Sequence, residues 1–154
     1  MRMRVMAVGT RLPAWARSAC DEYLRRLSAL NLTLVQLEPT RRAGAAAARA
    51  VSSEGARLLG MLRPAEHVVA LDERGKELST RELAAWLKQR QQAGEDLAFL
   101  IGGADGLAPE VLARSHFRWS LSRLTLPHAL ARVLVTEQLY RAHSILTHHP
   151  YHRD

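Results

Sequence analysis

The chain has 154 residues, a formal net charge of +7 at pH 7 and 47% hydrophobic residues. This length and composition are typical of one globular domain, residues 1–154, and exclude a wholly disordered chain. Twenty of the 22 basic residues are arginine, which favours a polyanionic partner such as RNA or DNA, although a coding bias toward arginine would give the same count.

Cysteine content and apolar runs add exclusions. The single cysteine, Cys20, excludes an intrachain disulfide and a cysteine-based zinc site. The apolar stretch within residues 1–9 is too short for a signal peptide, and no run approaches the length of a membrane span. We therefore expect a reduced, cytoplasmic protein.

Apolar periodicity predicts strands that alternate with helices. We expect strands at residues 2–9, 32–37, 67–71, 96–101 and 117–121. We expect helices at residues 13–30, 45–61, 79–93 and 128–146, and a short helix that begins at Pro109. Residues 41–44, 72–76 and 148–154 are expected to be irregular. Ser79 and Glu82 have the spacing of a capping box. This order predicts an α/β fold with a mostly parallel, five-stranded sheet flanked by helices.

Two segments at predicted strand ends are candidate ligand-binding loops. Gly102-Gly103-Ala104-Asp105-Gly106 follows a strand, and ligands of α/β proteins bind at the carboxyl ends of strands. It lacks the G-x-G-x-x-G pattern and a Walker lysine, so a simple tight turn is the alternative. Residues 120–128 look extended and offer backbone amides and carbonyls to an adenine or a ribose, unless they are only an edge strand that leads into a helix.

The last predicted helix is apolar on more than one face. Arg132, Thr136 and His143 form only a narrow polar line along residues 128–146. A helix of this kind is buried on two sides, either against a second subunit or as the central helix of a monomer.

The tail contains several groups that carry chemistry. Its histidines match no zinc motif, so we expect no metal site. A base-stacking Tyr151, a titratable His152 and a phosphate-facing Arg153 would suit an RNA site. A frayed terminus is the alternative.

Together these segments resemble one known family over essentially the whole chain. The strand followed by Gly-Gly-x-x-Gly, the segment SLSRLTLPHALARVLVTEQLYRA and the tail HPYHR are similar to the RlmH-type ribosomal large-subunit RNA methyltransferases of the SPOUT, or α/β-knot, superfamily. The resemblance implies a C-terminal trefoil knot, which general topology rules would not predict. It also implies a homodimer that forms through the C-terminal helix and the knot region. Its implied activity is methylation of N3 of a pseudouridine in the helix 69 stem-loop of large-subunit (23S) rRNA in the assembled ribosome.

The resemblance also implies roles for individual residues. The family's cofactor is S-adenosylmethionine, and its binding positions correspond here to Leu71, Gly103, Ser122, Arg123, Leu124, Thr125, Leu126 and Pro127. Ala104-Asp105 stands where some members have Pro-Glu, a conservative change.

The implied methyl acceptor is an imide nitrogen, which is protonated at neutral pH. A base must remove this proton, or cations must stabilise the resulting anion. His152 is the first candidate for the base, with Tyr151 and Arg153 to position the nucleobase or stabilise charge. His128 and Arg132 are second candidates.

Other functions stay open from the sequence. A basic α/β protein could bind RNA or assist ribosome assembly without chemistry, and an enzyme of the same fold could methylate another RNA such as tRNA. A nicotinamide-dependent enzyme is disfavoured, because the chain lacks the glycine fingerprint and an evident acidic ribose partner. Since 154 residues leave little room for separate cofactor and substrate domains, we expect one subunit to bind the cofactor and its neighbour to help hold RNA.

Overall fold

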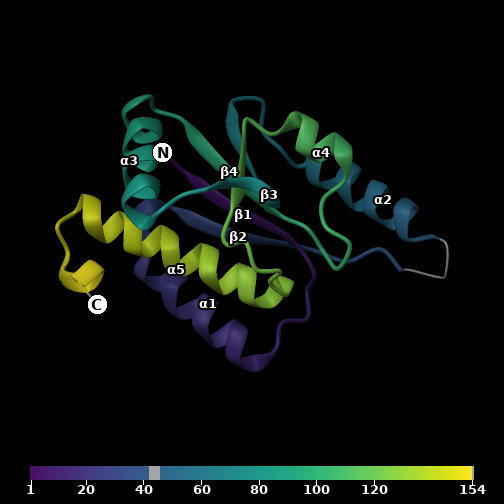
Figure 1. Ribbon diagram of the computed structural model, residues 1–154, viewed down its shortest axis with the longest axis horizontal. Coiled ribbons are helices and arrows are strands. Elements are labelled where there is room, and N and C mark those ends of the chain that lie inside the picture. The colour runs from purple at the N-terminus through teal and green to yellow at the C-terminus, as the bar shows by residue number, and fades with distance from the viewer. Residues whose placement is uncertain (42–45, 154) are drawn as a thin grey trace.

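A computed structural model describes residues 1–41 and 46–153. Within these ranges, five strands form one parallel sheet in the order β2-β1-β4-β3-β5 (Figure 1). The strands are β1 (Met3–Val8), β2 (Leu32–Leu37), β3 (Glu66–Glu77), β4 (Asp96–Ile101) and β5 (Phe117–Ser120). The helices are α1 (Ala14–Arg26), α2 (Ala47–Gly60), α3 (Thr80–Gln92), α4 (Pro109–Arg114) and α5 (His128–Leu146), with 3-10 turns η1 (Ser28–Leu30) and η3 (Pro150–Arg153). The predicted α/β fold with a five-stranded sheet is confirmed.

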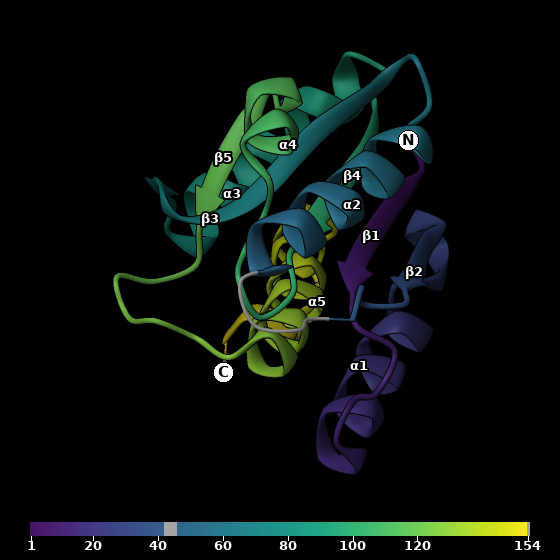
Figure 2. The same cartoon turned by 90° about the vertical axis from the view of Figure 1, so that its right-hand side faces the viewer.

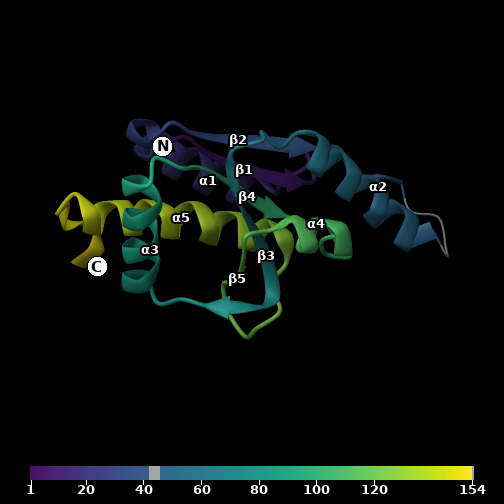
Figure 3. The same ribbon diagram turned by 90° about the horizontal axis from the view of Figure 1, so that it is seen from above.

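Helices cover both faces of the sheet, so the molecule has three layers (Figures 1 and 3). Helices α1, α3 and α5 pack on one face, where Val5 and Ala7 of β1 point. Helices α2 and α4 pack on the other face, where Met6 and Val8 point. Because successive side chains of a strand point to opposite faces, a strand covered on both sides reads as a continuous apolar run. This explains the run at the start of the chain.

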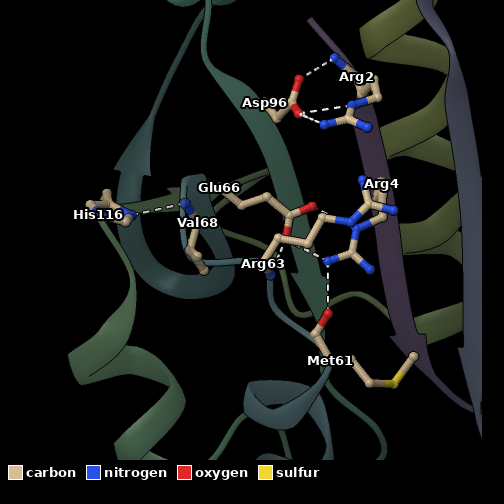
Figure 4. Close-up of polar contacts among 8 residues, drawn as sticks. All are labelled: Arg2, Arg4, Met61, Arg63, Glu66, Val68, Asp96 and His116. Atoms are coloured by element: carbon tan, nitrogen blue, oxygen red, sulfur yellow. Dashed lines mark hydrogen bonds and ion pairs between the residues drawn. The ribbon is translucent and has the colours of Figure 1, made fainter.

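Arg2, just before β1, and Arg4, in β1, bind carboxylates of β4 and β3 at the amino end of the sheet (Figure 4). The backbone N–H and Nε of Arg2 donate to Asp96 at 2.7 and 2.9 Å. Nε of Arg4 donates to Oε1 of Glu66 at 2.7 Å, and the backbone N–H of Arg63 donates to the same carboxylate at 2.8 Å. These contacts join β1, β3 and β4 at the edge opposite the strand carboxyl ends.

The helix expected at residues 13–30 is interrupted. Helix α1 ends at Arg26, and Leu27 leaves helical geometry with φ −88° and ψ 6°. After η1, Asn31 adopts the left-handed conformation with φ 48°. Asparagine is among the residues that reach this region most readily, and this turn directs the chain into β2.

The loop expected at residues 72–76 is wrong. Strand β3 continues to Glu77, with an irregularity between Leu71 and Lys76, and its second part pairs with Trp119 and Ser120 of β5. Backbone pairing rather than side-chain burial holds this part in the sheet. Its charged side chains therefore conceal a strand from any prediction based on apolar periodicity.

The tail expected to be irregular contains the 3-10 turn η3 over Pro150–Arg153, so that expectation is wrong for these residues. The remaining expectations on secondary structure are largely met. Helix α5 has the predicted bounds, and the capping box of α3 is present, with Ser79 Oγ accepting from the Glu82 N–H at 3.2 Å and Glu82 Oε2 accepting from the Ser79 N–H at 2.7 Å. The loop expected at residues 41–44 lies, apart from Arg41, outside the described residues. In the described part of the chain, no helix has the length and apolar character needed to cross a membrane.

Candidate functional site

A cavity of about 920 Å³ opens at the carboxyl ends of the strands. Its walls are the middle of β3, the end of β4, the glycine loop and the connection between β5 and α5, which swings out from the sheet in Figure 2. Seven of the eight residues that the resemblance implies for cofactor binding line it: Leu71, Gly103, Ser122, Leu124, Thr125, Leu126 and Pro127. The eighth, Arg123, is exposed beside them. The structure thus brings these positions together from segments about 50 residues apart.

The glycine loop is both a tight turn and a wall of the cavity. Gly103 and Gly106 form an isolated backbone bridge, and the Gly106 N–H donates to the Gly103 carbonyl at 3.1 Å. A Cβ added to Gly102 would lie 2.5 Å from the carbonyl carbon of Gly106. Only glycine fits such an approach of two backbone segments. The loop geometry therefore depends on the glycine at position 102.

The connection before α5 is not an edge strand. Strand β5 ends at Ser120, and residues 121–127 belong to no strand. Local hydrogen bonds shape this connection, because Ser120 Oγ donates to the Ser122 carbonyl at 2.9 Å and the Leu124 N–H donates to Ser122 Oγ at 3.0 Å. The alternative of an edge strand is therefore wrong, and the segment is a loop that faces the cavity.

Sequence reasoning missed three charged residues of the cavity. Asp72, Glu73 and Arg74 line it from the second part of β3. Asp72 Oδ1 accepts from the Arg74 N–H at 3.1 Å, within the irregular part of β3 between Leu71 and Lys76. Their charged run was visible in the sequence, but its place beside the cavity follows from the unexpected continuation of β3.

The second candidates for proton transfer lie at the start of α5. His128 is exposed and lines the cavity. Arg132, one helical turn further on, is completely buried, and its Nη2 donates to the Gly9 carbonyl at 3.0 Å. In this conformation only His128 can reach a molecule bound in the cavity.

The tail is ordered and packs on α5. The Tyr151 ring lies 4.6 Å from that of Tyr140, and the Arg141 guanidinium lies 4.7 Å above it. Burial, followed by contact with Tyr23 and Glu137, raises the pKa of the Tyr151 phenol well above its ordinary value. The alternative of a frayed terminus is therefore wrong for residues 148–153.

His152 and Arg153 lie at the end of this ordered tail. His152 is half-buried, with its Nδ1 2.5 Å from the His149 carbonyl, and Arg153 is exposed. Within the described residues, no group of three or more His, Cys, Asp or Glu side chains could hold a metal ion.

The tail follows the C-terminal end of α5 (Figure 3), whereas the cavity is lined by Pro127, His128 and Ala131 at the start of this helix. The helix has 19 residues, which corresponds to a length of about 28 Å at 1.5 Å per residue. Within one chain, His152 therefore lies far from the cavity that His128 lines. The helix itself packs against α1, α3, β4 and η3, so one chain alone buries several of its sides.

Comparison with known proteins places the chain in a family. A family model described as "Predicted SPOUT methyltransferase" matches residues 1–152. Two relatives, from Chromohalobacter salexigens and Thiobacillus denitrificans, are named Ribosomal RNA large subunit methyltransferase H, and each is 49% identical to this chain. The alignments cover 99% and 100% of this chain, respectively, and the full length of both relatives.

Solved structures share the fold. A probable methyltransferase from Bordetella pertussis Tohama I has a TM-score of 0.58 at 19% identity, with 92% of this chain and 93% of that chain covered. A Legionella pneumophila protein solved in complex with the cofactor SAM has a TM-score of 0.50 at 9% identity, with 93% and 66% covered. The α/β-knot superfamily implies the trefoil knot expected above. By its sequence over nearly its whole length, this chain belongs to the SPOUT methyltransferase family.

Proposed function

We propose that this protein is an S-adenosylmethionine-dependent methyltransferase that methylates N3 of a pseudouridine in the helix 69 stem-loop of 23S rRNA during ribosome maturation. The observation that carries the proposal is the cavity, which gathers seven of the eight cofactor positions of a family whose relatives are named as large-subunit rRNA methyltransferases. Action on ribosomes would take place in the cytoplasm.

The cavity fits this cofactor in size and chemistry. Its volume of about 920 Å³ lies within the range of pockets that bind small molecules. Residues 121–127, outside any strand, offer backbone groups to the adenosine part, and Asp72 and Glu73 offer carboxylates to hydroxyl or ammonium groups. S-adenosylmethionine supplies a methyl group on a sulfonium ion. The role of the protein is then to align the acceptor with that methyl group, and such alignment can contribute ~7–11 kcal/mol.

The separation of cavity and tail supports a shared site in a homodimer. In a two-fold dimer, the same surface of each chain meets its counterpart. If the α5 helices pair in an antiparallel sense, each tail approaches the cavity of the other subunit. Trp15, 56% exposed, lies at the start of α1 beside the apolar cluster of Leu12, Ala16 and Ala129, and it offers surface for such a pairing.

In this arrangement the tail supplies the groups that act on the RNA. His152 accepts the imide proton, and the exposed Arg153 stabilises the negative charge that develops on the base. Tyr151 stays protonated because its pKa is raised, so it holds the tail in place rather than accepting a proton. His128, at the cavity, is the second candidate for the base.

Methyl transfer from labelled cofactor to ribosomes of a deletion strain, followed by nucleoside mass analysis, tests the proposal. We expect label in N3-methylpseudouridine of 23S rRNA. Label in tRNA would instead assign the enzyme another substrate. If titration calorimetry detects no binding of S-adenosylmethionine in the micromolar range, the protein is an RNA-binding protein without chemistry.

A further inference from the structure

Arg132 is a charged side chain buried without a matching anion. It is the largest fully buried side chain among the described residues. Nη2 donates to the carbonyls of Val8 and Gly9 at 3.4 and 3.0 Å, whereas Nε and Nη1 have no hydrogen-bond partner and the structure gives Arg132 no ion pair with a described residue. Burying a charge without a counter-charge is costly. The burial of Arg132 therefore lowers the stability of the fold, and the described residues supply no anion that offsets this loss.

The guanidinium lies beside the cavity. Gly9, at the carboxyl end of β1, has φ +122°, and a Cβ placed on it would lie 3.3 Å from Arg132 Nη2 and 3.8 Å from His128 Nε2. The guanidinium and the imidazole therefore flank the same point of the backbone. His128 and Ala131, which both precede Arg132 on α5, line the cavity.

The N-terminus of α5 adds to the positive potential at this wall. Its N-cap is Pro127, which makes no side-chain cap, and its first turn has no acidic residue. The backbone N–H groups at the start of a helix carry partial positive charge and favour a bound anion. Asp72 and Glu73 line another wall of the same cavity. Arg74 follows them on that wall, so its two carboxylates outnumber its one cation, and the cavity has one positive wall and one wall of net negative charge.

We propose that the N-terminus of α5, with Arg132 behind it, binds the carboxylate of the amino-acid end of S-adenosylmethionine. Arg132 is a positioning residue in this arrangement, because it acts through its field and through the Gly9 backbone that it holds. A zwitterionic amino-acid group has a carboxylate for the positive wall and an ammonium group for Asp72 and Glu73. A phosphate of RNA has no counterpart for the negative wall, so the cofactor is favoured over RNA. The inference rests on the cofactor of the proposed function.

Calorimetric titration with two ligands tests the inference without any methyl transfer. The ligands are S-adenosylmethionine and decarboxylated S-adenosylmethionine, which retains the sulfonium and ammonium groups. We expect the unmodified protein to bind the decarboxylated ligand about tenfold more weakly. In Arg132→Gln this ratio should fall to about threefold or less, whereas Arg132→Lys and the exposed control Arg81→Gln should retain it.

A second variant covers the case in which Arg132→Gln fails to fold. His128→Asp changes an exposed residue at the first position of α5, where an acidic side chain stabilises a helix. The variant places a carboxylate at the positive wall. It should therefore weaken the binding of S-adenosylmethionine more than the binding of the decarboxylated ligand.

The opposing outcomes are distinct. If Arg132→Gln and His128→Asp each weaken the binding of both ligands by the same factor, Arg132 has only a structural role and the inference fails. If the ligand ratio stays at its unmodified value while ribosome binding becomes less dependent on salt, the anion is an RNA phosphate and the inference also fails. If the unmodified protein binds neither ligand, both the proposed function and this inference fail.

Discussion

The hydroxyl of Tyr151 donates a hydrogen bond to Oε1 of Glu137 at 3.1 Å, and this bond fastens the C-terminal tail to the middle of α5. The same hydroxyl lies 3.2 Å from that of Tyr23 on α1. Glu137 also accepts from Nε of Arg141 at 2.7 Å, so its carboxylate keeps a partner if Tyr151 is changed. The tail is thus held by a polar network that is centred on Glu137 in the middle of α5 and reaches Tyr23 on α1.

Tyr151→Phe should lower the free energy of unfolding by about 1 kcal/mol, because it removes the hydroxyl that bonds to Glu137 and Tyr23 and retains the ring packing. Urea denaturation measures this change. Tyr140→Phe is the matched control, since the structure gives the buried Tyr140 hydroxyl no hydrogen bond with a described residue. Equal stability of the two variants would contradict a fastening role for the Tyr151 hydroxyl.

His152→Ala should slow single-turnover methylation by about a hundredfold or more, which is the usual contribution of a general base. The affinity for S-adenosylmethionine should not change, because the proposed role of His152 is to act on the RNA and not on the cofactor. His149→Ala removes a neighbouring exposed imidazole and serves as control. An unchanged single-turnover rate in His152→Ala would exclude this residue as the base.

Gly102→Ala should abolish cofactor binding, because the added Cβ would lie 2.5 Å from the Gly106 backbone. Gly60→Ala is the control, since a Cβ at the end of α2 meets no atom within 4 Å. Calorimetric titration compares the two variants. Wild-type affinity in Gly102→Ala would show that the loop does not shape the cofactor site.

His152→Ala and Gly102→Ala together also test whether the proposed site is shared between two subunits. A mixture of His152→Ala and Gly102→Ala proteins should regain methylation that neither has alone, because each mixed dimer has one intact cavity facing one intact tail. If the mixture stays inactive after subunit exchange has been verified, cavity and tail of the same chain act together, and the two-fold arrangement is wrong.

Glu66→Gln should destabilise the fold by about 3 kcal/mol, because it leaves the Arg4 guanidinium buried without its counter-charge. The double variant Arg4→Met, Glu66→Met should recover most of this loss. Burial opposes ionisation of Glu66, but the hydrogen bonds from Arg4 and Arg63 outweigh it and hold its pKa below the ordinary value. This stabilisation is present above about pH 4.3 and is lost as pH falls through the folded-state pKa. Urea midpoints between pH 5 and pH 3 should therefore fall less in the double variant.

Stability should also fall at milder acidity because of His67. Its ring stacks on His116 at 4.7 Å, its Nδ1 lies 3.3 Å from Glu95, and its Nε2 is buried without a partner. Burial lowers the pKa of His67, with smaller contributions from His116 and Arg90, and Glu95 only partly opposes this. Because the folded-state pKa lies below the unfolded value of about 6.5, this contribution is present above pH 6.5 and is lost as pH falls through the folded-state pKa.

His67→Phe retains an aromatic ring beside Trp86 and removes this titration. The urea midpoint should therefore change less between pH 7 and pH 5 than in the unmodified protein. An identical pH dependence in His67→Phe would exclude His67 as the source.

The sequence alone determined the fold class and most of the secondary structure. Continuous apolar runs predicted β1 and β4, helical periodicity predicted α5 with its observed bounds, and Ser79 with Glu82 predicted the start of α3. These signals are local, because strand burial, helix periodicity and capping each depend on residues a few positions apart. The cofactor positions were also predicted from the sequence, but through resemblance to a family and not through physical reasoning, and seven of these eight positions line one cavity.

Only the tertiary structure decided where these residues lie relative to one another. It extended β3 through a charged segment, since backbone pairing with β5 needs no apolar side chains. It buried Arg132, although the sequence offered that residue for catalysis. It also placed His128 and His152 at opposite ends of one helix. Helical rise sets that distance, whereas the sheet and the packing on α1 and α3 decide which end meets the cavity.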